Sequence, residues 1–116
     1  MLEALPFTGT TRVANKGVDV ALVVYPTSTE SAIQAARICG VCGISTAVLE
    51  VTQLYPPDQR TLEHFCVTAG KLVFESETLM LAHQIPKGID VCILENSSVK
   101  AMSDAVFAIK RKAIIL

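Results

Sequence analysis

The chain has 116 residues, of which 51% are hydrophobic and 18% are charged, and its formal net charge is −1. This apolar content is enough for a full core and excludes a disordered chain, and the length suits one domain. The longest basic run is Lys110-Arg111-Lys112, so nucleic acid is not expected as the main partner.

Predicted strands and helices alternate along the chain. Short apolar runs rich in β-branched residues predict the strands, and apolar residues at helical spacing predict the helices. The expected strands cover residues 10–15, 18–25, 44–51, 71–75 and 89–95. The expected helices lie within residues 27–43, 55–70 and 97–112, with a short helix or turn over 76–85. This order predicts an α/β fold in which helices cover both faces of a mainly parallel sheet, with residues 10–15 as an antiparallel edge strand.

Local signals predict where the first two long helices begin and end. Thr27 and Glu30 have the spacing of a capping box, in which each side chain satisfies a free backbone N–H. Prolines 56 and 57 suit the start of the second helix. Gly43 and Gly70 each follow the last apolar position of a helix, where glycine suits a left-handed stop.

The N-terminal residues lack the charged-then-apolar layout of a signal peptide. No apolar run approaches the roughly 20 residues that span a membrane, so no membrane partner is expected. We therefore expect a soluble, cytoplasmic protein whose four cysteines are reduced. Residues 1–116 are expected to form a single domain, in which residues 1–9 are a loose lead segment.

The order of these motifs resembles the C-terminal domain of thiamine-diphosphate enzymes. Members include transketolase, deoxyxylulose-phosphate synthase and the β subunit of 2-oxoacid dehydrogenase E1. The resemblance covers roughly Pro6 to Glu77 and is closest in the segment "GISTAVLEVTQLYPPDQRTLEHFCVTAGKLVFESE". The residues in register with the family pattern are Leu54, Pro57, Asp58, Leu62, Gly70, Val73 and Glu75. The resemblance implies a three-layer α/β/α sandwich with a five-stranded mixed sheet of order 1-3-2-4-5, strand 1 being antiparallel.

The sequence departs from the family pattern at one loop and at one segment that is a helix in the family, and the family's closing segment after the fifth strand is not recognisable. Pro26 stands where the family has a glycine after the second strand. The segment "SETLMLAHQIPKG" is shorter than its family counterpart and lacks a Gly pair. No ligand contact is therefore carried over from the family to these segments.

The resemblance also implies a function. In the family, thiamine diphosphate and its Mg are bound by two other domains, one of which carries a Gly-Asp-Gly…Asn motif; this sequence has no Gly-Asp-Gly. The resemblance therefore implies a non-catalytic domain or split subunit that serves subunit packing or partner docking. No catalytic residue, cofactor or metal is expected on this chain alone, and its partners would be copies of itself or other subunits of a parent enzyme.

Cys39 and Cys42 have the C-x-x-C spacing of redox motifs and zinc sites. A thioredoxin-type pair needs its first cysteine at a helix N-terminus, where the helix dipole lowers the thiol pKa. Here the pair falls at the end of a predicted helix, so Cys39 is expected in the core and Cys42 in the exposed last turn. Cys66 and Cys92 stand singly, so the paired spacing of a zinc site is absent from the sequence.

The histidines lack a motif that would make them catalytic. His64 is expected to face solvent beside Glu63, and His83 lies in an irregular segment. A catalytic histidine needs an acid to orient it and a nucleophile nearby, and no sequence motif supplies them.

The alternative function is a free-standing module that binds a small anion at Thr27, Ser28 and Thr29. These hydroxyls lie between a strand and a helix N-terminus, where free N–H groups can hold an anion. In the implied strand order the crevice lies between the second and fourth strands, so these residues would face Glu75, Ser76 and Glu77. The acidic neighbours would oppose a phosphate, and plain helix capping explains the same residues.

An interface is expected in the divergent segment from Thr78 to Pro86. Large apolar residues crowd this short stretch, which departs from the family pattern. The residues expected to contact a partner are Leu79, Met80, Leu81 and Ile85.

Overall fold

A computed structural model describes residues 11–54 and 58–112. The expected lead segment 1–9 and the prolines 56 and 57 lie outside the described residues. The strands are β1 (Thr11–Asn15), β2 (Val20–Val24), β3 (Thr46–Val51), β4 (Lys71–Phe74) and β5 (Asp90–Ile93). The helices are α1 (Thr29–Val41), α2 (Gln59–Ala69), α3 (Glu77–Leu81) and α4 (Val99–Lys112), and a 3₁₀ turn, η2, covers Pro26–Ser28.

The five strands form one mixed sheet of order β1-β3-β2-β4-β5. β1 is antiparallel to β3, whereas the β2–β3, β2–β4 and β4–β5 pairs are parallel. Both the fold class and the strand order implied by the resemblance are confirmed. β2 lies at the centre of the sheet, and all five of its residues are buried, as its valine-rich run predicts.

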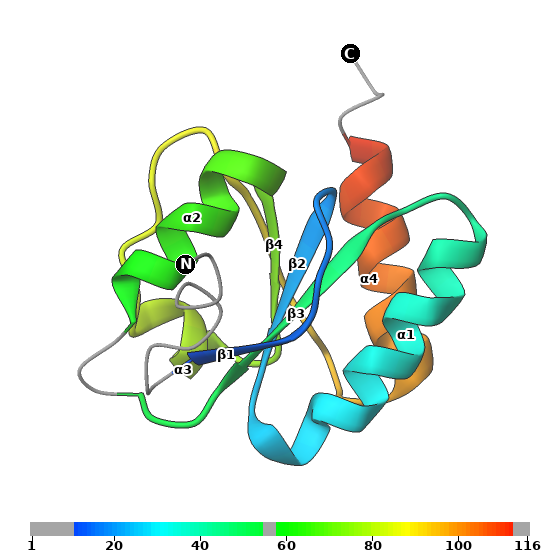
Figure 1. Ribbon diagram of the computed structural model, residues 1–116, viewed down its shortest axis with the longest axis horizontal. Helices are drawn as coiled ribbons and strands as arrows, with labels where there is room; N and C mark the ends of the chain where they lie inside the picture. The colour runs from blue at the N-terminus through cyan, green and yellow to red at the C-terminus, as the bar shows by residue number, and fades with distance from the viewer. Residues whose placement is uncertain (1–10, 55–57, 113–116) are drawn as a thin grey trace.

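Helices cover both faces of the sheet, which gives three layers (Figure 1). α1 and α4 lie side by side on one face, and α2 and α3 lie on the other. Alternate residues of β2 point to opposite faces, so Leu22 belongs to the core under α1 and α4, and Val23 to the core under α2 and α3. Within the described residues, every helix is too short or too polar to cross a bilayer.

The predicted C-terminal ends of the first two long helices are confirmed. Gly43 follows the C-terminus of α1 at φ 85°, and Gly70 caps α2 at φ 70°. A side chain at this φ is strained, so glycine suits both positions. Asp58 is the N-cap of α2, and its carboxylate accepts from the Thr61 N–H.

The predicted capping box at Thr27 and Glu30 is wrong. Thr27 lies inside the 3₁₀ turn, α1 begins at Thr29, and the N-cap residue Ser28 makes no side-chain cap bond. The neighbouring hydroxyls instead bond to carboxylates far along the chain.

Candidate functional site

The candidate anion site lies at the carboxyl edge of the sheet, where the chain leaves β2. The connection through α1 leads from β2 to β3 on one side, and the chain later returns to β4 on the other side of β2. Ligands of open α/β sheets bind at such a topological switch point. Here Thr27 is exposed, whereas Ser28 and Thr29 are buried.

Glu75, directly after β4, joins three segments at this edge. Its Oε1 accepts the backbone N–H of Tyr25 at 2.8 Å, and its Oε2 accepts the Ser28 hydroxyl at 2.5 Å. The Ser97 hydroxyl, from the loop before α4, donates to Oε2 at 2.6 Å. A single carboxylate therefore holds together the loops that follow β2, β4 and β5.

Tyr25 and Ser76 add a second bond between the same two loops. Their hydroxyl oxygens lie 2.9 Å apart, and Ser76 Oγ also accepts the N–H of Leu79 as the N-cap of α3. Of the residues expected to face Glu75, Ser76 and Glu77, Ser28 thus contacts Glu75, whereas the Thr29 hydroxyl donates to Glu50 on the other side of β2.

Glu50, in β3, forms a second carboxylate centre at this edge. The Thr29 hydroxyl donates to its Oε2 at 2.7 Å, and Arg12 Nε on β1 donates to its Oε1 at 2.9 Å. The Glu50 side chain is 12% exposed. These hydrogen bonds, that from Arg12 first and that from Thr29 second, hold the pKa of Glu50 below its ordinary value.

The two carboxylates determine what this edge can bind. The buried hydroxyls of Ser28 and Thr29 already donate to Glu75 and Glu50, and the Arg12 guanidinium is paired with Glu50. A phosphate or diphosphate placed here would meet two negative charges. The residues at this edge therefore do not fit the diphosphate of a cofactor, and anion binding at residues 27–29 stays a prediction.

We expect the stability of the fold to fall in acid partly through Glu50. Because its folded pKa is lowered, the ionised carboxylate stabilises the fold fully above the unfolded value, and this contribution is lost as pH falls through the folded pKa. The Glu50→Gln variant has no ionisable group at this position, so it lacks this pH-dependent contribution. Urea unfolding at a series of pH values should therefore show a wild-type advantage that is constant at neutral pH and shrinks below pH 4.5. A difference that does not change with pH would contradict this assignment.

The cysteines lie where the helical pattern predicts. Cys39 is fully buried between α1 and α4, and burial raises the pKa of its thiol. Cys42 is exposed at the end of α1. Cys66 is buried, and burial is the main cause that raises its thiol pKa as well. A raised thiol pKa lowers the thiolate fraction, which is the opposite of a redox-active cysteine.

The two histidines differ in burial. His64 is exposed on α2, as predicted, with its ring edge against Phe65. His83 is buried after α3, and its Nδ1 lies 2.9 Å from the Leu79 carbonyl oxygen. Within residues 11–54 and 58–112, no three His, Cys, Asp or Glu side chains gather in a way that could hold a metal ion.

The four residues expected at an interface separate in the structure. Leu79 is 0% exposed and belongs to the core under α2 and α3, whereas Leu81 is 68% exposed. Met80 and Ile85 are partly buried against the same core. Leu79 therefore packs within the chain and Leu81 is exposed, and an interface at this segment stays a prediction.

Sequence reasoning found Glu75 as a neighbour of the candidate site but missed Glu50, Arg12 and Ser97. The partner of Thr29 is 21 residues away along the chain, and Ser97 is 22 residues from Glu75. A signal for Glu50 and Arg12 lies in the sheet register, because the two residues stand opposite each other on β3 and β1. That register follows from the strand order and is not visible in either segment alone.

No family model and no curated protein matches the sequence. Among solved structures, the chain is similar to one described as a split-gene transketolase in the form of an inactive β4 tetramer, with a TM-score of 0.74 and 21% identity over 90% of this chain. It is also similar to 2-oxoglutarate:ferredoxin oxidoreductase from Magnetococcus marinus, with a TM-score of 0.67 and 11% identity over 94% of this chain. The chain spans 42% and 21% of those two chains. It therefore has the fold of one part of these larger proteins, and the sequence and the structure point to the same transketolase-like C-terminal domain fold.

Proposed function

We propose that the chain is a non-catalytic C-terminal-type domain or split subunit of a thiamine-diphosphate-dependent enzyme, serving subunit packing or partner docking. The observation that carries the proposal is the fold, with its order β1-β3-β2-β4-β5 and antiparallel β1. A split-gene transketolase contains this fold as 42% of one of its chains, within an inactive tetramer. A split gene of that kind provides a setting in which a partial chain works beside another subunit.

The chemistry of the carboxyl edge is consistent with a non-catalytic role. Glu75 and Glu50 hold the hydroxyls and the guanidinium that a diphosphate would need. Under the proposal, thiamine diphosphate and Mg are bound by other domains of the parent enzyme. This chain contributes surfaces that pack against those domains.

The native polypeptide tests the proposal. An antibody against the chain would isolate the native protein under gentle conditions, and mass spectrometry would identify every polypeptide present. We expect either a longer native chain or a co-purifying subunit that carries a Gly-Asp-Gly…Asn motif. A 116-residue native polypeptide that is monomeric by light scattering and co-purifies with no such subunit would overturn the proposal.

The alternative is a small-anion-binding module at residues 27–29. One observation favours it: the N-cap Ser28 makes no side-chain cap bond, so the first N–H groups of α1 are not capped by its hydroxyl. The carboxylates of Glu75 and Glu50 oppose it. A thermal-shift series with inorganic phosphate separates the two, because a ligand that binds the folded state must raise its melting temperature.

A further inference from the structure

The two edges of the sheet differ in how they are protected. Edge strands expose backbone groups that pair with other strands unless charges, bulges or prolines prevent it. β1, at one edge, carries Arg12 and a register irregularity between Val13 and Asn15. β5, at the other edge, reads Asp-Val-Cys-Ile and contains neither Lys nor Pro, and the charge of Asp90 is paired with Lys71 of β4 at 2.9 Å. Within the described residues, no strand pairs with the outer side of β5.

The hydrogen bonds to β4 show which residues of β5 present their backbone outward. The N–H of Asp90 donates to Gly70, and the N–H of Leu94 donates to Phe74, so residues 90, 92 and 94 face β4. The intervening residues, Val91 and Ile93, therefore direct their N–H and C=O groups away from the sheet. Ile93 is also 38% exposed, which is high for an isoleucine in a strand.

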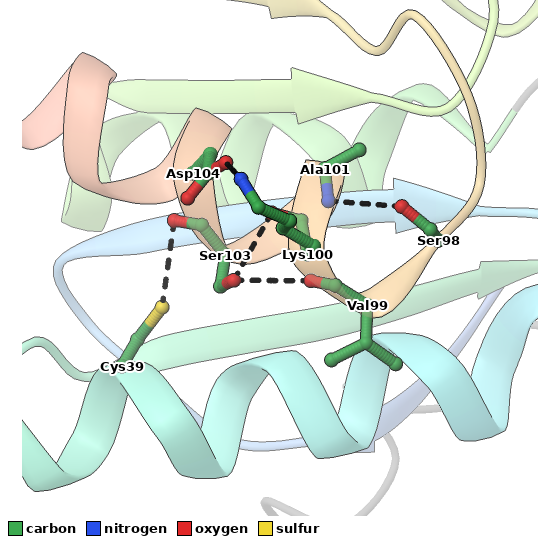
Figure 2. Close-up of polar contacts among 7 residues, drawn as sticks. All are labelled: Cys39, Ser98, Val99, Lys100, Ala101, Ser103 and Asp104. Carbon is green, nitrogen blue, oxygen red and sulfur yellow. Dashed lines mark hydrogen bonds and ion pairs between the residues drawn. The ribbon is translucent and has the colours of Figure 1, made fainter.

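A groove runs along this edge between β5 and α4. It has a volume of about 380 Å³, and its lining includes Ile93, Glu95, Lys100, Ala101, Asp104 and Ala105. Lys100 and Asp104 form an ion pair at 2.7 Å along this side of α4. Figure 2 shows the pair on the side of α4 away from Cys39 and α1.

We propose that a second copy of this chain pairs with the outer edge of β5, so that two antiparallel β5 strands join the sheets into one. The proposal rests on the proposed packing function and names its partner and its surface. A two-fold axis passes between Cys92 and its counterpart. Val91 and Ile93 then form hydrogen-bonded pairs across the axis with Ile93 and Val91 of the other copy.

In this register, Val91 and Ile93, whose backbone groups face outward, each pair with an outward-facing residue of the other copy. It places apolar Val91 beside apolar Ile93 on the α2 side of the sheet, since alternate residues share a face. The two Cys92 side chains meet on the α4 side as a non-hydrogen-bonded pair, the closer of the two antiparallel pair types.

The charges of α4 favour a copy of the same chain over an unrelated peptide. A two-fold axis reverses the direction of the second α4, so the Lys100 end of one helix faces the Asp104 end of the other. Lys100 and Asp104, two of the three charged residues that line the groove beside Glu95, are therefore self-complementary, as an isologous interface requires. Ala101 and Ala105 between them leave room for the approaching side chains.

Analytical ultracentrifugation of the full chain and two variants tests the proposal. Ile93→Lys places an ammonium beside the apolar partner strand, and Val91→Pro removes an outward N–H that the bonds to β4 do not use. Because each substitution occurs twice in the dimer, we expect the dimer Kd to rise by on the order of 100-fold. Val41→Lys is the control, since Val41 is 89% exposed on α1, away from β5.

A cross-link locates the interface directly. In a Cys42→Ser background, a short bismaleimide should join two chains through Cys92, and Cys92→Ser should abolish the product. A dimer that survives both β5 variants and yields no such product overturns the β5 interface but leaves a packing function intact. A chain that stays monomeric yet co-purifies with a subunit bearing the Gly-Asp-Gly…Asn motif also overturns the β5 interface and leaves the packing function intact. A monomer with no such subunit removes both proposals.

Discussion

Replacing Glu75 with alanine is expected to cost about 2–4 kcal/mol of unfolding free energy, because hydrogen bonds to a charged group contribute about 1.5–3 kcal/mol each and are not additive. The carboxylate accepts from Tyr25, Ser28 and Ser97. Without it, the hydroxyl of Ser28, a residue that is 7% exposed, loses its acceptor. Urea unfolding at neutral pH measures the difference.

Two further substitutions separate the role of this carboxylate from a general effect of lost charge. Glu75→Gln keeps the shape of the side chain and one acceptor oxygen. Its unfolding free energy should therefore fall by only about 1–2 kcal/mol, roughly half of the loss expected for Glu75→Ala. Glu77→Ala, two residues further on, removes an exposed carboxylate from α3 and should change stability by less than about 0.5 kcal/mol. Equal losses for Glu75→Ala and Glu77→Ala would show that Glu75 does not hold the three loops together.

The sequence predicts the core of this fold well because the core follows local periodicity. Five buried residues in β2 produce one continuous apolar run, and the helical spacing of Cys39 places it in the core. Gly43 and Gly70 end their helices with a positive φ that the sequence pattern predicts. Each of these features depends on residues within one element, so a short segment contains the whole signal.

The polar contacts at the carboxyl edge could not be predicted in the same way. Thr27 and Glu30 satisfy the local rule for a capping box, yet the hydroxyls beside them donate to Glu75 and Glu50. A carboxylate that folds into hydrogen-bonding distance is a stronger acceptor than the local alternative. The position of such a carboxylate depends on the strand order. The family resemblance implied that order, whereas local sequence patterns did not predict it.

The short segment after β4 is a second place where local patterns do not predict the structure. Leu79, Met80 and Leu81 are consecutive apolar residues, so no period marks which of them faces the core. Leu79 is buried and Leu81 is exposed. α3 has only five residues, and Leu79 is its one buried residue, in the core that also contains residues of α2 and β4. Crowding of apolar residues indicated a partner surface but did not identify which residue contributes to it.

Gly17→Ala is expected to destabilise the chain by about 3 kcal/mol or more, because overpacking against rigid backbone costs at least the 1–3 kcal/mol seen for side-chain overpacking. A Cβ at residue 17 would overlap the carbonyl carbon of Thr46 and the amide nitrogen of Ala47, and would lie 2.7 Å from the Thr46 oxygen. These are backbone atoms at the start of β3, so no side-chain rotation relieves the overlap. Moving them would also strain the bonds from Val18 and Asp19 to Ser45.

The matched control for Gly17 is Gly40, where the same substitution should have the opposite effect. Gly40 lies within α1, and a Cβ there meets nothing within 4 Å. Alanine lowers the backbone entropy of the unfolded chain and favours the helix, so Gly40→Ala should stabilise by about 0.5–1 kcal/mol. Both variants add one methyl group, so urea unfolding of the pair isolates the effect of position. A loss of under about 1 kcal/mol for Gly17→Ala would mean that the β1–β2 connection moves at little cost, and would contradict the close approach of Gly17 to the backbone of Thr46 and Ala47.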